Sequence, residues 1–414
     1  MKQGFHYAYL IVASCIAITC LPCALMLSCA GIFFTPVSEY FGVARATFTL
    51  YFSILNIAMM LTLPVAGNLM AKHDLRVILS GAVALAGLGC IGMSFCQAMW
   101  QFYVCGAVMG VGVAPLIYLA VPTLINAWCR ERVGFFVGLA MAFTGIGGVI
   151  FNPIGTSIIN SGAESWRTAY LVFGLIALVG TLPFTLFVVR SRPEDKGLLP
   201  YGYKAEDEGA SSGAVEVSGV PAEVAMKKPA FYALAVFCGI ITLNQTIYQF
   251  LPSYATSFEA TLPEIAAASG IVASAAMAGQ AIGKVFLGTV SDKSIRLGLV
   301  CGFAAGAIGV ALMWVFPSPL FLLLAGAFLF GIVYAMTVVE TPLLVRDVFG
   351  SADYTKIYAR ISMVGSLMSA VAAVFWSFVI DSAGGFPLMF ILSFVCMGIC
   401  FVTANFALSN KPSA

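Results

Sequence analysis

Long apolar stretches separated by short polar connections dominate the chain. A helix crosses a bilayer with about 20 consecutive apolar residues, and cutting the sequence at its charges, prolines and turn residues leaves twelve such segments. They cover residues 7–35, 46–69, 75–96, 100–127, 133–159, 167–189, 230–256, 264–290, 297–315, 320–345, 356–380 and 386–408. The pattern predicts an all-α membrane protein with twelve transmembrane helices. The first stretch is longer than the apolar part of a signal peptide, so we interpret it as the first membrane helix.

One long polar stretch interrupts this series between the sixth and seventh segments. It contains Glu206, Asp207 and Glu208, followed by a Gly/Ser-rich piece at 209–213. Such a composition is typical of a flexible linker. We therefore predict a six-helix bundle over 1–190, a cytoplasmic linker over 191–229 and a second six-helix bundle over 230–414.

The distribution of basic residues predicts the orientation of the helices. If both termini are cytoplasmic, 17 of the 20 Lys and Arg residues lie on the cytoplasmic side, Arg45 and Arg167 lie outside, and Lys284 lies within a helix. This is the bias of the positive-inside rule. We expect a multi-pass protein of the cytoplasmic (plasma) membrane with both termini inside.

Composition narrows the classes of function. With 61% hydrophobic and 9% charged residues the chain is no soluble globule, and a net charge of +2 excludes a nucleic-acid partner. The 12 cysteines lie mostly in apolar runs and only two histidines are present, so we expect no metal and no cofactor. No nucleophile with a base and no ATP-type phosphate loop is visible. We expect a monomer that is not an enzyme, with lipid and a small molecule as its partners.

A short motif occurs in both halves of the chain. The segments that begin at Gly67 and Gly288 share a glycine, an acid and basic residues at a displacement of 221 positions. Gly-x-x-x-Asp-Lys-x-x-Arg at 288–296 resembles the loop motif of the major facilitator superfamily, which there pins neighbouring helices together on the cytoplasmic side. The resemblance implies two six-helix bundles, a substrate site between them near mid-membrane, and a cytoplasmic gate at Gly67, Lys72, Asp74, Arg76, Gly288, Asp292, Lys293 and Arg296. In the first copy Ala71 replaces the usual acid, so the locking role there either rests on Asp74 or is weakened.

A narrower resemblance covers most of the chain. Residues 41–46, 126–134, 145–153 and 165–170 are similar to the monocarboxylate transporter and oxalate/formate antiporter groups. The resemblance implies transport of a small organic anion with a proton or in exchange for another anion. The glycines on the fifth helix, Gly134, Gly138, Gly145 and Gly148, are expected to let helices pack closely.

Two ionisable residues lie well inside predicted helices. Inserting a charged side chain at the centre of a membrane helix costs about 2.5–3.5 kcal/mol, so we expect each of the two to have a functional or structural role. Lys284 lies eight residues before Asp292, which at about 1.5 Å per residue places it roughly 12 Å from the cytoplasmic end. The resemblance implies that this residue binds the substrate carboxylate. The alternative is a lysine that snorkels or pairs structurally with Glu340.

Glu340 is the second residue of this kind. We expect it to pair with Lys284 or with Arg360, and it serves either as a proton-coupling group or as one partner of a structural ion pair. In the monocarboxylate transporters an acid lies one turn before the basic residue, whereas here Gln280 occupies that place. Ser28 matches their first-helix lysine, and Gly365 matches the second cation of the oxalate antiporters. One fixed positive charge favours a monoanion.

Several polar groups on the helices are candidates to line the cavity, although helix–helix packing is an alternative for each. The candidate substrate-binding set comprises Lys284, Tyr248, Asn244, Gln280, Gln249, Tyr118, Ser28 and Tyr334. We predict a secondary transporter of a small organic anion, favouring a monocarboxylate, by proton symport or anion exchange. The alternative is a carrier of the same fold for a neutral or drug-like solute, which would not depend on Lys284.

Overall fold

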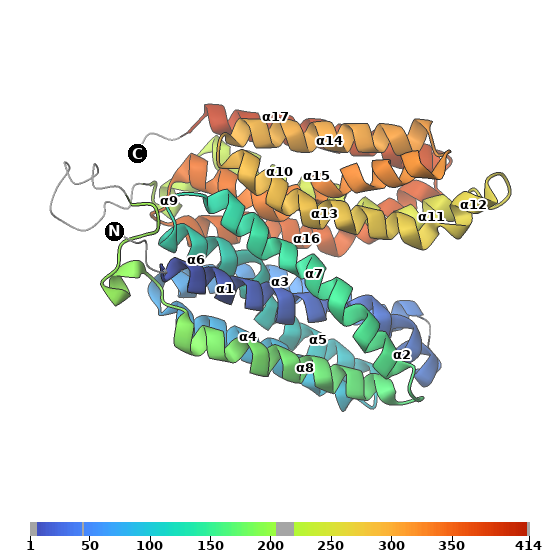
Figure 1. Cartoon of the computed structure of the whole chain (residues 1–414), viewed down its shortest axis with the longest axis horizontal. Helices are drawn as coiled ribbons and strands as arrows, with labels where there is room; N and C mark the ends of the chain where they lie inside the picture. The colour runs from blue at the N-terminus through green and yellow to red at the C-terminus, as the bar shows by residue number, and fades with distance from the viewer. Residues whose placement is uncertain (1–5, 44, 204–218, 412–414) are drawn as a thin grey trace.

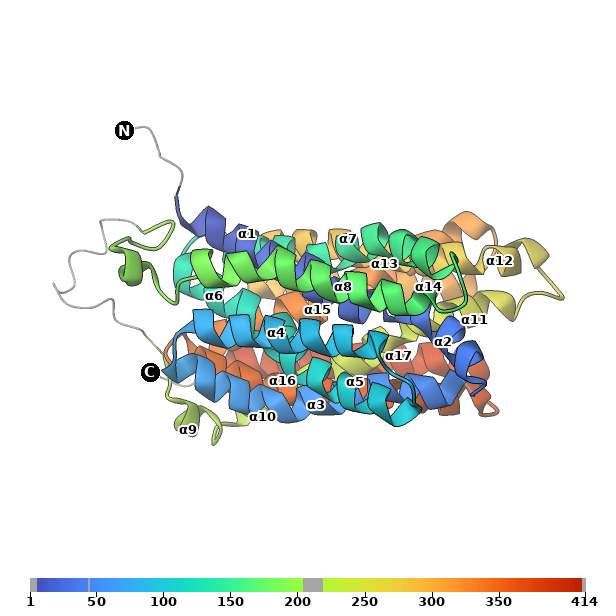
Figure 2. The ribbon, with the colours of Figure 1, turned by 90° about the horizontal axis from the view of Figure 1, so that it is seen from below.

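Helices make up the architecture of the protein (Figures 1 and 2). The computed structural model describes residues 6–43, 45–203 and 219–411. The acidic and Gly/Ser-rich parts of the predicted linker, Glu206 to Glu208 and 209–213, lie outside the described residues. Within the described residues twelve helical segments are long and apolar enough to cross a bilayer, which confirms the twelve predicted spans.

The helices follow one another with short connections. The first half contains α1 (Ala8–Ile18), α2 (Phe34–Phe41), α3 (Arg45–Lys72), α4 (Leu75–Ser94), α5 (Met99–Ala114), α6 (Val121–Trp128), α7 (Val133–Ile159) and α8 (Ser165–Pro183). The second half contains α9 (Ala222–Ala225), α10 (Pro229–Gln245), α11 (Leu251–Thr256), α12 (Pro263–Ala267), α13 (Ser269–Ser291), α14 (Ile295–Val315), α15 (Leu320–Phe349), α16 (Tyr354–Asp381) and α17 (Gly385–Ser409). Several spans combine two of these elements, because wider or tighter helical turns join them.

Irregular turns inside the spans occur beside prolines. The first span runs from α1 into the π-helical turns of η1 (Thr19–Ser28), which contain Pro22, and the fourth changes from α5 to α6 through η3 (Pro115–Ala120). A proline removes one backbone donor and crowds the preceding turn, so the helix adjusts locally. The first and fourth spans continue through these turns.

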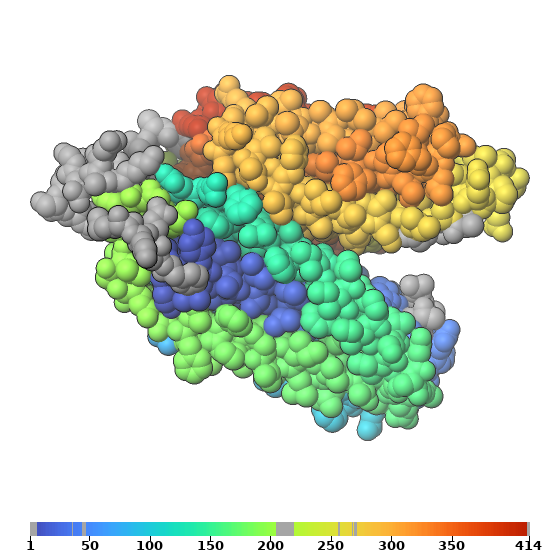
Figure 3. Space-filling model, in the orientation of Figure 1, coloured from blue at the N-terminus to red at the C-terminus, as the bar shows by residue number. Residues whose placement is uncertain are grey.

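The helices form two bundles that meet along two seams. In one seam α7 of the first half packs against α13 of the second, and in the other α3 packs against α16. Helix α1 begins and α17 ends at the same end of the molecule, which we call the terminal face; α7 begins there, and α3, α13 and α15 end there. The halves lie together near this face and diverge toward the opposite end, which we call the distal face and which carries α2 and α12 (Figure 3).

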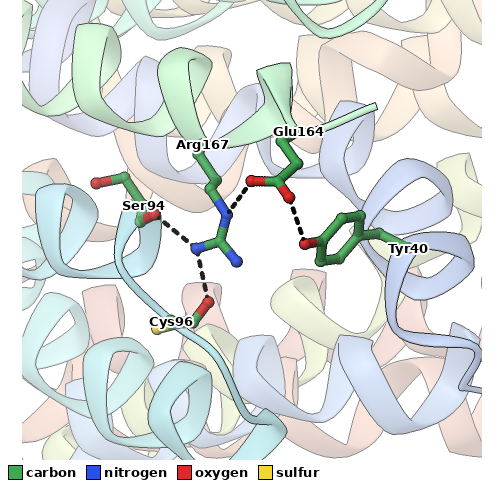
Figure 4. Close-up of polar contacts among 5 residues, drawn as sticks. All are labelled: Tyr40, Ser94, Cys96, Glu164 and Arg167. Atoms are coloured by element: carbon green, nitrogen blue, oxygen red, sulfur yellow. Dashed lines mark hydrogen bonds and ion pairs between the residues drawn. The ribbon is translucent and has the colours of Figure 1, made fainter. Parts of the chain in front are cut away.

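Arg167 joins two connections of the first half at the distal face and, through Glu164, helix α2 (Figure 4). One of its terminal nitrogens donates to the carbonyl oxygens of Ser94 and Cys96 at 2.9 and 2.8 Å, and its Nε pairs with Glu164 at 3.4 Å. Glu164 in turn accepts from the Tyr40 hydroxyl at 2.7 Å. These contacts hold the distal end of the first bundle together as a unit.

Candidate functional site

Lys284 lies in the central part of α13, and its side chain is 4% exposed. Its Nζ donates to Gln280 Oε1 at 2.9 Å, one turn earlier on the same helix. It also donates to Thr144 Oγ1 at 2.8 Å and to the Met141 carbonyl oxygen at 3.2 Å, both on α7 of the other half. An ammonium has three N–H donors, so each has an acceptor here. All three acceptors are neutral, and no carboxylate in the described part of the chain pairs with Lys284.

Thr144 is a site residue that the sequence patterns did not indicate. Its hydroxyl donates to the Met141 carbonyl oxygen at 2.8 Å and therefore offers its lone pair to Lys284. Its own carbonyl oxygen accepts from the hydroxyl of Ser28 in η1 at 3.2 Å. Thr144 thus connects Lys284 with Ser28, which was predicted to lie at the site.

Glycines allow α7 and α13 to approach closely around Lys284. A Cβ atom on Gly138 would clash with the Lys284 carbonyl oxygen, and one on Gly134 would clash with that of Gly288. Gly145 is looser, since its Cβ would lie 3.6 Å from Gln280 Oε1. The predicted role in close packing is therefore confirmed for Gly134 and Gly138, and this packing explains how Lys284 can reach the Met141 carbonyl oxygen of the other half.

A group of three tyrosines includes one that lies near the ammonium group. The rings of Tyr248 and Tyr334 are stacked, with centroids 5.1 Å apart and planes 15° apart, and Lys284 Nζ lies 6.0 Å from the Tyr334 centroid. Tyr118 of the first half is close enough to Tyr334 for an electrostatic interaction. All three tyrosines are half-buried. Rings of this kind favour a nearby cation and provide flat apolar walls.

Of the two other predicted residues, one contacts this group and one lies apart from it. Gln249 is exposed, and its side chain forms a hydrogen bond with Tyr248. Asn244 is fully buried and its Oδ1 accepts from Ser393 of α17 at 2.8 Å, so it contacts another helix of the second half. The structure therefore brings together Lys284 with Gln280, Ser28, Tyr118, Tyr248 and Tyr334, and does not bring Asn244 to them.

Glu340 lies on α15 and is fully buried, but it does not pair with Lys284 or Arg360 as expected. Its Oε1 accepts from the hydroxyl of Ser291 at 2.6 Å, and its Oε2 has no hydrogen-bond partner. Gly298 on α14 leaves the room for this contact, since a Cβ there would clash with Ser291 Oγ. The predicted ion pairs are wrong for this conformation because Glu340 faces α14 and the end of α13, whereas Lys284 faces α7.

Asp292 links the two halves at the terminal face. Its Oδ1 accepts from the backbone N–H of Gly134 at 2.6 Å and its Oδ2 from that of Phe135 at 2.8 Å, so it caps the first turn of α7 across the seam. Burial raises the pKa of the Asp292 carboxyl above the ordinary aspartate value, although these two amides act in the opposite direction. Arg132, with a φ of 56°, turns the chain just before this helix start.

The first copy of the motif acts differently. Asp74 caps its own helix by accepting from the backbone N–H of Arg76 at 2.9 Å, and it also accepts from the hydroxyl of Ser191 at 3.1 Å. Arg76 donates to the Leu186 carbonyl oxygen at 2.7 and 3.0 Å. Gly67 packs against Ala359 of α16. Of the two open alternatives for this copy, the described contacts favour a weakened lock, because Asp74 bonds only within its own half.

The remaining basic members of the motif lie on the surface. Lys72, Lys293 and Arg296 are exposed at the terminal face. Lys293 and Arg296 line a hollow there together with Asp347 and Lys411. Their positions are compatible with side chains that extend to lipid headgroups.

Comparisons with known proteins agree with this architecture. The family model described as Major Facilitator Superfamily matches residues 16–273 and 265–414. "Monocarboxylate transporter 12" of Xenopus laevis is 24% identical over 97% of this chain and 88% of that protein. The human "Monocarboxylate transporter 12" is 30% identical over 45% of this chain and 37% of that protein.

Solved structures share the fold. A structure of the proton:xylose symporter XylE superimposes with a TM-score of 0.70 at 15% identity, covering 98% of this chain and 96% of that chain. The transporter FucP in its outward conformation gives a TM-score of 0.68 at 16% identity, covering 97% of this chain and 98% of that chain. These relatives and neighbours are membrane transporters and not enzymes.

Proposed function

Because the chain belongs to the Major Facilitator Superfamily, we propose that it is a secondary transporter of a small organic anion, favouring a monocarboxylate. The terminal face is the cytoplasmic side, as the distribution of basic residues predicts, and the membrane is the plasma membrane. The state described above has its halves together on the cytoplasmic side.

The observation that carries this proposal is the uncompensated charge of Lys284. A buried ammonium whose acceptors are all neutral leaves a positive potential in a low-dielectric setting. A carboxylate satisfies that charge better than a hydroxyl, an amide and a backbone carbonyl do, because charge-assisted hydrogen bonds are shorter and roughly twice as strong as neutral ones. One ammonium matches one carboxylate, which favours a monoanion.

The contacts of Lys284 also supply a link between binding and movement. Two of its three acceptors, on Thr144 and Met141, belong to the opposite half. A substrate carboxylate that takes over those donors removes two bonds across the α7–α13 seam. Substrate binding thereby lowers the cost of separating the halves on the cytoplasmic side, as alternating access requires.

Glu340 is the proposed proton-coupling group. A buried carboxyl with one hydroxyl partner and one unpartnered oxygen is costly to keep ionised. We expect Glu340→Gln to uncouple transport from a pH gradient while exchange persists. Equal pH dependence in the wild type and the variant would assign Glu340 a structural role and leave anion exchange as the mode of transport.

The test of the main proposal uses purified protein in lipid vesicles and a panel of labelled monocarboxylates: acetate, lactate, pyruvate and benzoate. Lys284→Ala should abolish uptake, Lys284→Arg should retain part of it, and Lys227→Ala, which changes an exposed lysine, should leave it unchanged. Thermal unfolding confirms that each variant is folded. Unchanged carboxylate uptake in the alanine variant would overturn the proposal and favour the alternative carrier, which would not depend on Lys284.

A further inference from the structure

A cavity lies on the terminal face, where the halves meet, and its lining does not include Lys284. Its volume is about 850 Å³, within the roughly 300–1,000 Å³ range of small-molecule sites. Residues of the loop before α7 line one side, and the ends of α13 and α15 line the other. A ligand there would touch both halves at once.

Glu131, Asp292 and Asp347 supply the carboxylates that line this cavity, and each already has an interaction partner. Both oxygens of Asp292 accept from the amides of Gly134 and Phe135. Asp347 pairs with Lys411 at 2.6 Å. Both of these carboxylates therefore already have hydrogen-bond or ion-pair partners, although Asp292 also interacts electrostatically with Arg132 and Arg346.

Four basic residues line the same cavity: Arg130, Arg132, Lys293 and Arg346. None of them forms an ion pair within residues 6–43, 45–203 and 219–411. Arg130 of the first half and Arg346 of the second are close enough to repel each other electrostatically, and Arg346 is half-buried. The four basic residues outnumber the three carboxylates that line the cavity, so an added anion stabilises the closed seam.

We propose that this cavity binds a multivalent phosphate-bearing anion that bridges the two halves. Guanidinium groups bind phosphate oxygens through paired N–H donors, and several around one cavity select a group with more than one negative charge. Because the cations of both halves converge only while the seam is closed, the anion stabilises that arrangement. On the proposed orientation it is a cytoplasmic regulator that holds the cytoplasmic side closed, and it depends neither on Lys284 nor on the transported solute.

The test uses the full chain in phosphatidylcholine nanodiscs with inorganic pyrophosphate as the probe. Pyrophosphate should raise the unfolding temperature and slow hydrogen exchange over residues 133–136, and its binding should weaken with added salt. Arg346→Gln should weaken binding at least tenfold. Lys293→Gln, at an exposed position, should weaken it severalfold without a risk to folding, and Lys227→Gln should have no effect.

A lipid headgroup carries the same phosphate chemistry, so a second arm uses nanodiscs that contain phosphatidylglycerol. If these lipids slow exchange over 133–136 without pyrophosphate, and Lys293→Gln removes the effect, the site is confirmed with a lipid as its source. If only pyrophosphate slows exchange over 133–136, the site is confirmed with a soluble anion as its ligand. Absence of protection in both arms, or protection that survives both substitutions, would overturn the proposal.

Discussion

The bond between Asp292 and the start of α7 can be tested by a single substitution. Asp292→Asn keeps the size of the side chain, but its amide nitrogen cannot accept a hydrogen bond, so one of the two bonds to Gly134 and Phe135 is lost. The negative charge at the helix N-terminus is lost with it. Hydrogen bonds to charged groups contribute about 1.5–3 kcal/mol, and because part of the carboxylate is exposed to solvent, the lower end, about 1.5–2 kcal/mol, applies.

A change of that size shifts the equilibrium of the closed seam by about 10- to 30-fold. The assay is hydrogen exchange, read by mass spectrometry over residues 133–136 of the protein in nanodiscs. Exchange there should accelerate by that factor in Asp292→Asn. The same variant should also lower the unfolding temperature only slightly, because the contact joins two bundles that each retain their own core.

Asp74→Asn is the matched control. Asp74 accepts from Arg76 and Ser191 within the first half, so its replacement should weaken the start of α4 without a change in exchange at 133–136. Equal acceleration in both variants, or none in Asp292→Asn, would refute the inference that Asp292 alone of the two holds the halves together.

Three further outcomes follow from contacts of single residues. Thr144→Val removes a neutral acceptor that competes for Lys284, so affinity for a transported carboxylate, measured by thermal-shift titration, should rise severalfold, whereas Thr144→Ser should match the wild type. Gly138→Ala places a Cβ against the Lys284 carbonyl oxygen; overpacking of this kind costs about 1–3 kcal/mol, and exchange over 133–136 should rise although no charge has changed. For Asp353, burial raises the pKa, but the hydrogen bond from Lys356, at 2.7 Å, and a backbone amide outweigh burial and leave the pKa below the ordinary value of 3.8. The ionised carboxylate therefore stabilises the fold above pH 3.8, and this stability should be lost as pH falls below that value in wild type but not in Asp353→Asn.

Much of the fold was predictable because lipid imposes a simple rule. Every membrane-spanning backbone must satisfy its own hydrogen bonds, so apolar length and charge position define the helices. The seventh span, predicted at 230–256, runs from Pro229 to Ala255. The eighth differs at its start: the prediction begins at 264, but α12 and α13 are separate helices, and α13 begins at Ser269.

Site residues could be predicted where their residue type is costly to place in a membrane. They could not be predicted where the residue type is common in membrane helices. Lys284 stood out because a buried lysine needs partners. Thr144 did not, since a threonine in an apolar helix normally bonds to its own backbone and leaves no pattern. The pairing of Glu340 was wrong because depth in the membrane does not determine which neighbour a helical side chain faces.

The two seams differ in the chemistry of their contacts, and this difference indicates how an anion can act on the molecule. The α3–α16 seam is held by neutral groups: Gly67 packs against Ala359, and the hydroxyl of Ser366 donates to the Asn56 carbonyl oxygen at 3.2 Å. The α7–α13 seam carries two charged contacts, from Lys284 in the membrane and from Asp292 at its edge. An anion bound at Lys284 weakens only the α7–α13 seam. The halves should therefore separate first along this seam, while the α3–α16 seam stays closed and acts as the pivot.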